Sequence, residues 1–90
     1  MPWTVVETSA FTKQYSKAGL QNSEETKYQD WRGQVPEHGG IVAAQNLGYR
    51  VNKLKGADNQ WELYIGAAAR ISFTISNNPD TVTLVAVGHT

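Results

Sequence analysis

The chain has 90 residues, which is enough for one small domain and too few for two independent ones. Hydrophobic residues make up 40% of it and charged residues 18%, a balance that excludes a disordered chain. Eight basic and eight acidic residues give a net charge of zero, so any binding to nucleic acid or anionic lipid must use a local patch, and the absence of cysteine excludes disulfides and thiolate metal sites.

A first strand and a first helix are predicted within residues 3–19. Residues 3–7 are mostly β-branched and aromatic, which favours a strand. Thr8 or Ser9 can cap the helix that follows, and Gly19 can take the positive φ that ends it. Apolar side chains three and four residues apart give this helix one hydrophobic face: Phe11, Tyr15 and Ala18.

A second helix is predicted to begin near Asn22 and to end before Pro36. Asn22 and Glu25 have the spacing of a capping box, and proline interrupts helical hydrogen bonding. The apolar face of this helix consists of Tyr28, Trp31 and Val35. Residues 36–48 are rich in glycine and small side chains, so we expect a loop there, with one short extended piece around residues 41–42.

The second half of the chain predicts an antiparallel run of strands. Apolar segments alternate with turn-forming residues: 49–54, 60–65, 69–76 and 81–87. The last segment is apolar enough to be central in the sheet. Polar and apolar side chains alternate along 60–65 and 69–76, so one face should pack on the helices and the other should be polar. The sequence therefore predicts an α+β fold of one domain over residues 1–90, with both helices on one face of an antiparallel sheet.

The polar face of the sheet is where we expect a functional site. It should carry Glu62, Tyr64 and Arg70, whereas the face taken by Lys53 and Lys55 is not predicted by the pattern. A guanidinium group presents paired donors to phosphate oxygens, and an aromatic ring can stack on a base. The same pattern also fits a solvated, salt-bridged surface.

Metal, cofactor and membrane sites are not expected. The histidines, His38 and His89, have no companion ligands at metal-binding spacing. The three tryptophans are expected in the core rather than as platforms for bases. No stretch has the roughly 20 consecutive apolar residues of a membrane span, and the first residues do not follow the pattern of a signal peptide, so we expect a soluble cytoplasmic protein.

Four segments in order resemble a known family: PEHGG at 36–40, LGYRVNKLKG at 47–56, WELYIGAAARISFTI at 61–75 and TVTLVAVGH at 81–89. Together they resemble the RelE/ParE superfamily of bacterial toxins over nearly the whole chain. The resemblance implies a β-α-α-β-β-β(β) order and an antitoxin partner. Ribonuclease members of that family cut messenger RNA in the ribosomal decoding site, whereas gyrase-directed members inhibit DNA topology instead.

The resemblance also implies roles for individual residues. Arg70 stands where ribonuclease members have an arginine on the scissile phosphate, and His89 stands where several members have a catalytic or phosphate-contacting basic residue. Lys53 and Lys55 lie in a segment that is often positively charged in the family. Thr90 departs from it, because ribonuclease members continue there with arginine and a terminal tyrosine.

Cutting RNA without a metal requires a base for the 2′-hydroxyl proton, an acid for the leaving oxygen and a cation over the phosphate. The candidate catalytic residues are Arg70 as the cation and Glu62 or His89 as the base. The candidate RNA-binding residues are Arg50, Lys53, Lys55 and Tyr64. Glu62 and Tyr64 occupy positions where some ribonuclease members have lysine or arginine, which predicts reduced or altered activity.

Three hypotheses follow from these observations. The first is a ribosome-dependent mRNA endoribonuclease, without cofactor, that a cognate antitoxin neutralises. The second is a non-catalytic binding module of the same fold, either a gyrase inhibitor or an inactive toxin. The third is an unrelated small α+β domain whose C-terminal VGH is a coincidence. With few cations, we expect binding to free RNA to be weak and the ribosome to present the message.

Overall fold

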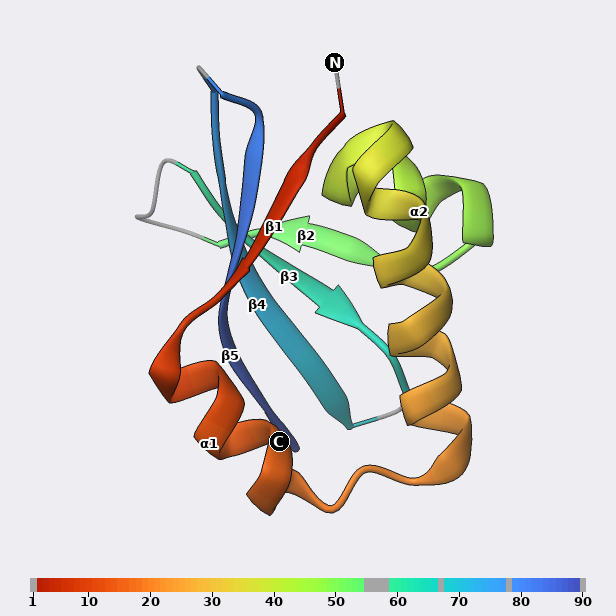
Figure 1. The fold of residues 1–90 in the computed structure, drawn as a ribbon. Helices are drawn as coiled ribbons and strands as arrows, with labels where there is room; N and C mark the ends of the chain where they lie inside the picture. The colour runs from red at the N-terminus through yellow and green to blue at the C-terminus, as the bar shows by residue number, and fades with distance from the viewer. Residues whose placement is uncertain (1, 55–58, 67, 78, 90) are drawn as a thin grey trace.

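The computed structural model describes residues 2–54, 59–66, 68–77 and 79–89 (Figure 1). The described residues contain two helices, α1 (Ser9–Ala18) and α2 (Asn22–Leu47). The strands among them are β1 (Thr4–Glu7), β2 (Val51–Lys53), β3 (Gln60–Tyr64), β4 (Ala69–Ser76) and β5 (Thr81–His89). They form one sheet in the order β1-β5-β4-β3-β2. The predicted α+β class and the predicted order of elements are confirmed.

The sheet is mixed rather than wholly antiparallel. Strands β2 to β5 pair antiparallel with their neighbours, as predicted, but β1 pairs with β5 in parallel, with Thr4 opposite Thr81. The pairing joins segments almost 80 positions apart, so no local pattern in the sequence indicates it. It places β5 between β1 and β4, which confirms the prediction that the last strand is central.

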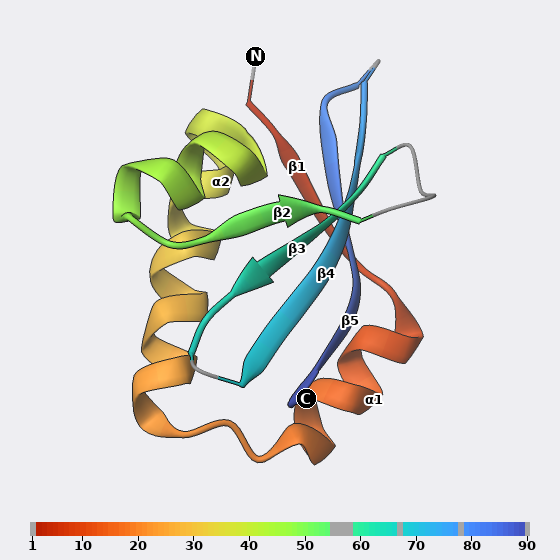
Figure 2. The ribbon, with the colours of Figure 1, turned by 180° about the vertical axis from the view of Figure 1, so that it is seen from behind.

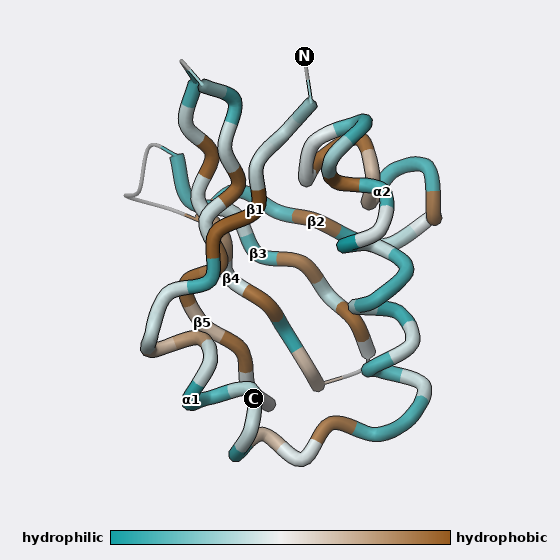
Figure 3. Tube along the Cα trace, viewed as in Figure 1, coloured by the Kyte–Doolittle hydropathy of each residue, from teal (hydrophilic) through white to brown (hydrophobic). Residues whose placement is uncertain are grey.

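Both helices pack on the same face of the sheet through a connected set of aromatic side chains. Ring centroids of Phe11 and Tyr28 lie 6.0 Å apart, those of Tyr28 and Trp31 6.4 Å, and those of Trp31 and Phe73 5.2 Å. Hydrophobic and hydrophilic residues alternate along β4 (Figure 3), and the inward residues Ile71 and Phe73 are fully buried. Neither α1 nor α2 covers the opposite face of β3 and β4, which Figure 2 shows.

A β-bulge in β5 keeps the hydrophobic side of that strand on the core. Ser72 pairs with Ala86 and Phe73 with Leu84, which leaves Val85 as the extra residue. Leu84 and Val87 are therefore both buried, although they are three positions apart. The side chain of Gln14 in α1 accepts the backbone N–H of Val87 at 3.0 Å, so α1 anchors the strand just beyond the irregularity.

The prediction that residues 36–48 form a loop with an extended piece is wrong. Helix α2 continues through Pro36, turns at Gly39 with φ 82° and ψ 171°, and resumes to Leu47. The turn frees the Pro36 carbonyl from helical bonding, and it accepts the backbone N–H of Trp3 at 2.7 Å. The small residues that suggested a loop instead permit close packing, because a Cβ on Gly40 would lie 2.8 Å from the Phe73 ring.

The beginning of α2 also differs by one position from the prediction. The backbone N–H of Gln21, rather than of Asn22, is bonded to a glutamate three positions ahead, Glu24 Oε1, at 2.9 Å. The helix before it begins and ends as predicted. Thr8 Oγ1 accepts the backbone N–H of Phe11 at 3.1 Å, and Gly19 has a φ of 60°.

Gly39→Ala should destabilise the protein. An alanine there would have to keep a left-handed φ, and its Cβ would lie 2.8 Å from the Trp3 ring. We expect a loss of about 1 to 3 kcal/mol from overpacking. Gly33→Ala is the matched control, because Gly33 is exposed in the same helix and a Cβ there meets nothing within 4 Å. In the control, the free energy of unfolding measured in urea should rise by about 0.5 to 1 kcal/mol. Equal unfolding midpoints for the two variants would contradict this account of the kink.

Candidate functional site

The uncovered face of the sheet collects charged and aromatic side chains from β3 and β4 and from the segment before β2. In the strand register, Tyr64 lies opposite Arg70, and Glu62 lies between Asn52 and Ser72. Arg50 joins them through the backbone, because its carbonyl accepts the N–H of Tyr64 at 2.9 Å. The prediction that Glu62, Tyr64 and Arg70 share a face is therefore confirmed by the register.

Arg70 and Glu62 form an ion pair on this face. Arg70 Nη1 donates to Glu62 Oε1 at 3.1 Å, and the two side chains are 34% and 17% exposed. Within the described residues, the Nε of Arg70 is buried and has no hydrogen-bond partner. A buried N–H donor without an acceptor is costly, and because this Nε is buried, only the terminal nitrogens of the guanidinium can meet a ligand. The pair leaves the guanidinium reachable and holds it in one orientation.

The ring of Tyr64 lies between two guanidinium groups. Arg50 Cζ and Arg70 Cζ are each 4.8 Å from its centroid; Arg50 lies just before β2 and Arg70 in β4, the strands on either side of β3. Both contacts are within the range of cation–π attraction. We call this set, Arg50, Tyr64 and Arg70, the arginine–tyrosine row. It brings two guanidinium groups, one of them paired with Glu62, to one face of a chain whose net charge is zero.

Comparisons with known proteins find similar folds among solved structures only. No protein-family model matches the chain, and no curated protein matches it. Among solved structures, the archaeal RelE–RelB complex from Pyrococcus horikoshii is similar at 12% identity, with 99% of this chain and 96% of that chain covered and a TM-score of 0.70. The YoeB dimer from Staphylococcus aureus is 13% identical, with 100% and 99% covered and a TM-score of 0.70. The chain has the fold of the RelE/ParE toxins.

A third similar structure is that of a free mutant of the E. coli toxin RelE. It is 18% identical, with 99% of this chain and 84% of that chain covered and a TM-score of 0.68. Each similarity extends over nearly the whole chain, as the sequence resemblance to the RelE/ParE superfamily predicts. The agreement covers all the described elements, from β1 to β5.

Lys53 is the one further predicted RNA-binding residue of this RelE/ParE-like chain that the described residues place, and it does not join the row. Lys53 pairs with Trp61, so its position in the register belongs to the helix-covered face. It is nevertheless exposed, because β2 is the edge strand of the sheet. Lys55 lies outside the described residues. The backbone of His89 pairs with that of Ala69, the residue before Arg70 in β4. The side chain of His89 is outside the described set. The roles of these residues stay predictions.

Asn52 is a neighbour of the row that the sequence reasoning missed. With its amide oriented so that both groups are satisfied, its oxygen accepts Arg50 Nε at 3.3 Å. Residues two apart in a strand share a face, so the spacing of Arg50 and Asn52 was the available signal. Asn52 helps to orient the Arg50 guanidinium toward Tyr64.

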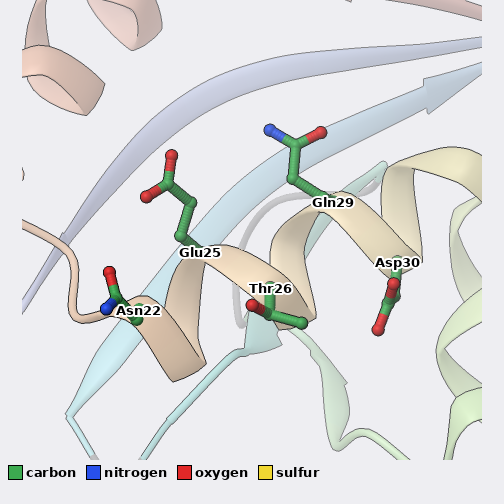
Figure 4. A pocket seen from close by; sticks show the side chains of 5 residues that line it. All are labelled: Asn22, Glu25, Thr26, Gln29 and Asp30. Atoms are coloured by element: carbon green, nitrogen blue, oxygen red, sulfur yellow. The ribbon is translucent and has the colours of Figure 1, made fainter.

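A hollow on the far side of α2 is separate from this site. It measures about 340 Å³ and is lined by polar side chains in two rows (Figure 4): Glu25 and Gln29 in one, Asn22, Thr26 and Asp30 in the other. Burial, together with the hydrogen bond and the charge of Glu25, raises the pKa of the nearby Tyr15 hydroxyl. The described residues hold no group of three or more potential metal ligands and no helix able to span a membrane. The row is therefore the stronger candidate site.

Proposed function

We propose that the chain is the toxin of a toxin–antitoxin system and acts as a metal-independent, ribosome-dependent mRNA endoribonuclease of reduced or altered activity. The fold supports the first part of the proposal. The observation that carries the second is Arg70, whose partly exposed side chain lies on an uncovered sheet face and is oriented by its ion pair with Glu62. A guanidinium held in this way can stabilise the negative charge that develops on a phosphate during cleavage.

The reaction follows from the chemistry of RNA. The 2′-oxygen attacks the adjacent phosphorus, the bond from phosphorus to the 5′-oxygen breaks, and a 2′,3′-cyclic phosphate and a 5′-hydroxyl result. Arg70 stabilises the charge on the non-bridging oxygens. Glu62 or His89 takes the 2′-hydroxyl proton, and an acid returns a proton to the leaving oxygen. Arg70 is then the group whose loss costs the most.

The partner in this proposal is an antitoxin protein. Two of the similar structures are complexes of RelE with RelB, which supports an antitoxin for this chain as well. The polar sheet face and the patches around Tyr49 and Tyr64 offer a surface for a partner helix. The ribosome and the message in the cytoplasm are the other partners, because so few cations can hold free RNA only weakly.

The proposal is tested by inducing the chain alone in cells. We expect growth to stop, new mRNA ends to appear within translated regions, and both effects to disappear when the protein encoded beside it is co-expressed. Lys13→Ala should behave as the wild type, because Lys13 is exposed in α1, on the helix-covered side of the sheet. Growth arrest with intact mRNA would favour the non-catalytic alternative, a binding module such as a gyrase inhibitor. Absence of any complex with the neighbouring protein would remove the antitoxin from the proposal.

A further inference from the structure

We propose that Arg50 and Arg70 form a clamp for two consecutive phosphates of single-stranded RNA and that Tyr64 is the spacer between them. The inference rests on the proposed function and specifies which part of the substrate the site holds. It assigns Tyr64 a different task from that of a stacking platform for bases.

The spacing of the two cations is set by the sheet. Tyr64 lies in β3, Arg70 lies opposite it in β4, and Arg50 is bonded to it from the other side. Because each Cζ is 4.8 Å from the ring centroid, the two guanidinium groups are separated by less than twice that distance. Neighbouring phosphates along one nucleic-acid strand fall within this span. The row thus offers two donors that are close enough together to meet neighbouring phosphates of one strand.

Tyr64 is suited to hold these cations apart. Two guanidinium groups would repel each other across a gap, whereas the π-face of an aromatic ring attracts each of them. With Arg50 from the segment before β2 and Arg70 from β4 both against the ring, a stacking base would have to compete with them. The contact depends on the ring and not on the hydroxyl, so phenylalanine should replace tyrosine here.

The two cations differ in how their charge is compensated. Arg70 is paired with Glu62, whereas Arg50 is exposed and forms no ion pair among the described residues. Arg50 is therefore the group that attracts an anion first. A second phosphate then reaches Arg70, whose side chain is 34% exposed and whose terminal nitrogens keep donors beyond the one given to Glu62.

The occupant that fits this surface is a nucleic-acid backbone. A protein partner on this face would have to bring an acidic side chain to each arginine, whereas a nucleic-acid backbone carries anions at regular spacing along its whole length. Contacts to phosphates carry no information about the base. We therefore expect the clamp to bind single strands with little sequence preference.

The clamp is tested by binding, without cleavage. The probes are oligouridylates with 2′-O-methyl groups, which cannot be cut, carrying one, two or five phosphates, measured by fluorescence anisotropy from low to moderate salt. For single strands, each phosphate contact contributes about 0.7 to the slope of log affinity against log salt. Arg50→Gln and Arg70→Gln should each lower the magnitude of the slope by about 0.7. Lys13→Gln should leave it unchanged, because Lys13 is exposed in α1, on the helix-covered side of the sheet.

The spacer is tested with two substitutions at one position. Tyr64→Ala should remove the preference for the two-phosphate probe over the one-phosphate probe, and Tyr64→Phe should retain it. Melting curves check that each variant is folded. A slope unchanged in Arg50→Gln, equal behaviour of the two Tyr64 variants, or no binding by the wild type at low salt would overturn the clamp.

The outcome is separable from that of the proposed function. A wild type that binds as predicted but never cuts mRNA would keep the clamp and remove the endoribonuclease. A wild type that cuts mRNA while Arg50→Gln binds normally would keep the endoribonuclease and remove the clamp.

Discussion

Arg70→Ala should lower the rate of ribosome-dependent mRNA cleavage by about a hundred- to a thousandfold. Removing one preorganised donor from a developing oxyanion typically costs about 2.7 to 4 kcal/mol of transition-state stabilisation. Arg70 is held for this role by its pair with Glu62 and by its contact with Tyr64. The measurement is the initial rate of mRNA cutting on purified ribosomes, with growth on induction as the readout in cells.

Two further variants show whether the loss is catalytic. Arg70→Lys keeps a positive charge beside Glu62 but lacks the planar paired donors. We therefore expect it to be as stable as the wild type while its cleavage rate stays close to that of Arg70→Ala. Ser72→Ala, two residues along the same face, should keep full activity and change stability by only about 0.5 kcal/mol. Full cleavage by a folded Arg70→Ala protein would refute the assignment of the phosphate-binding role to Arg70.

Trp31→Ala should destabilise the fold by about 3 to 5 kcal/mol, a large part of the total for a domain of this size. Trp31 is fully buried between Tyr28 and Phe73, and its Nε1 donates to the Gly40 carbonyl at 2.8 Å. It therefore joins both halves of the kinked helix α2 to the sheet. Urea unfolding followed by circular dichroism measures the loss.

Trp31→Phe separates packing from hydrogen bonding at this position. It keeps an aromatic ring against Phe73 but leaves the Gly40 carbonyl without the indole donor. The free energy of unfolding should therefore fall by about 1 to 3 kcal/mol. The difference between the two variants is then the contribution of the missing volume. A Trp31→Ala protein as stable as the wild type would show that this contact does not hold the helix to the sheet.

The parts of the fold that local patterns determine were predictable from the sequence. The alternation along β4 placed Arg70 on the open face and Ile71 in the core, because the side-chain period of a strand is two. The cap at Thr8 and the stop at Gly19 are likewise properties of a few adjacent residues.

The other features depend on contacts between distant segments. Proline and glycine at 36 and 39 suggested that α2 ends, but the Trp3 N–H takes up the freed Pro36 carbonyl and Phe73 packs on Gly40. Pairing of β1 with β5 is likewise invisible in either strand alone. For such features tertiary structure overrides the local signal.

The same division holds for the candidate site. That Glu62, Tyr64 and Arg70 share a face follows from their spacing, and the register confirms it. The pairing of β2 with β3 decides which face Lys53 takes. The same pairing brings Arg50 to Tyr64, and neither outcome can be read from the residues themselves. The ion pair of Glu62 with Arg70 is a further cross-strand contact of this kind.

The most direct test of the central proposal is cleavage of one defined mRNA in a reconstituted translation reaction. We predict that the wild-type protein cuts the message only when it is bound to ribosomes, and that a single 2′-deoxy substitution at the attacked nucleotide abolishes the cut, because the 2′-oxygen is the nucleophile. An intact message at protein concentrations that arrest growth, or cutting that persists at the deoxy position, would contradict the proposal.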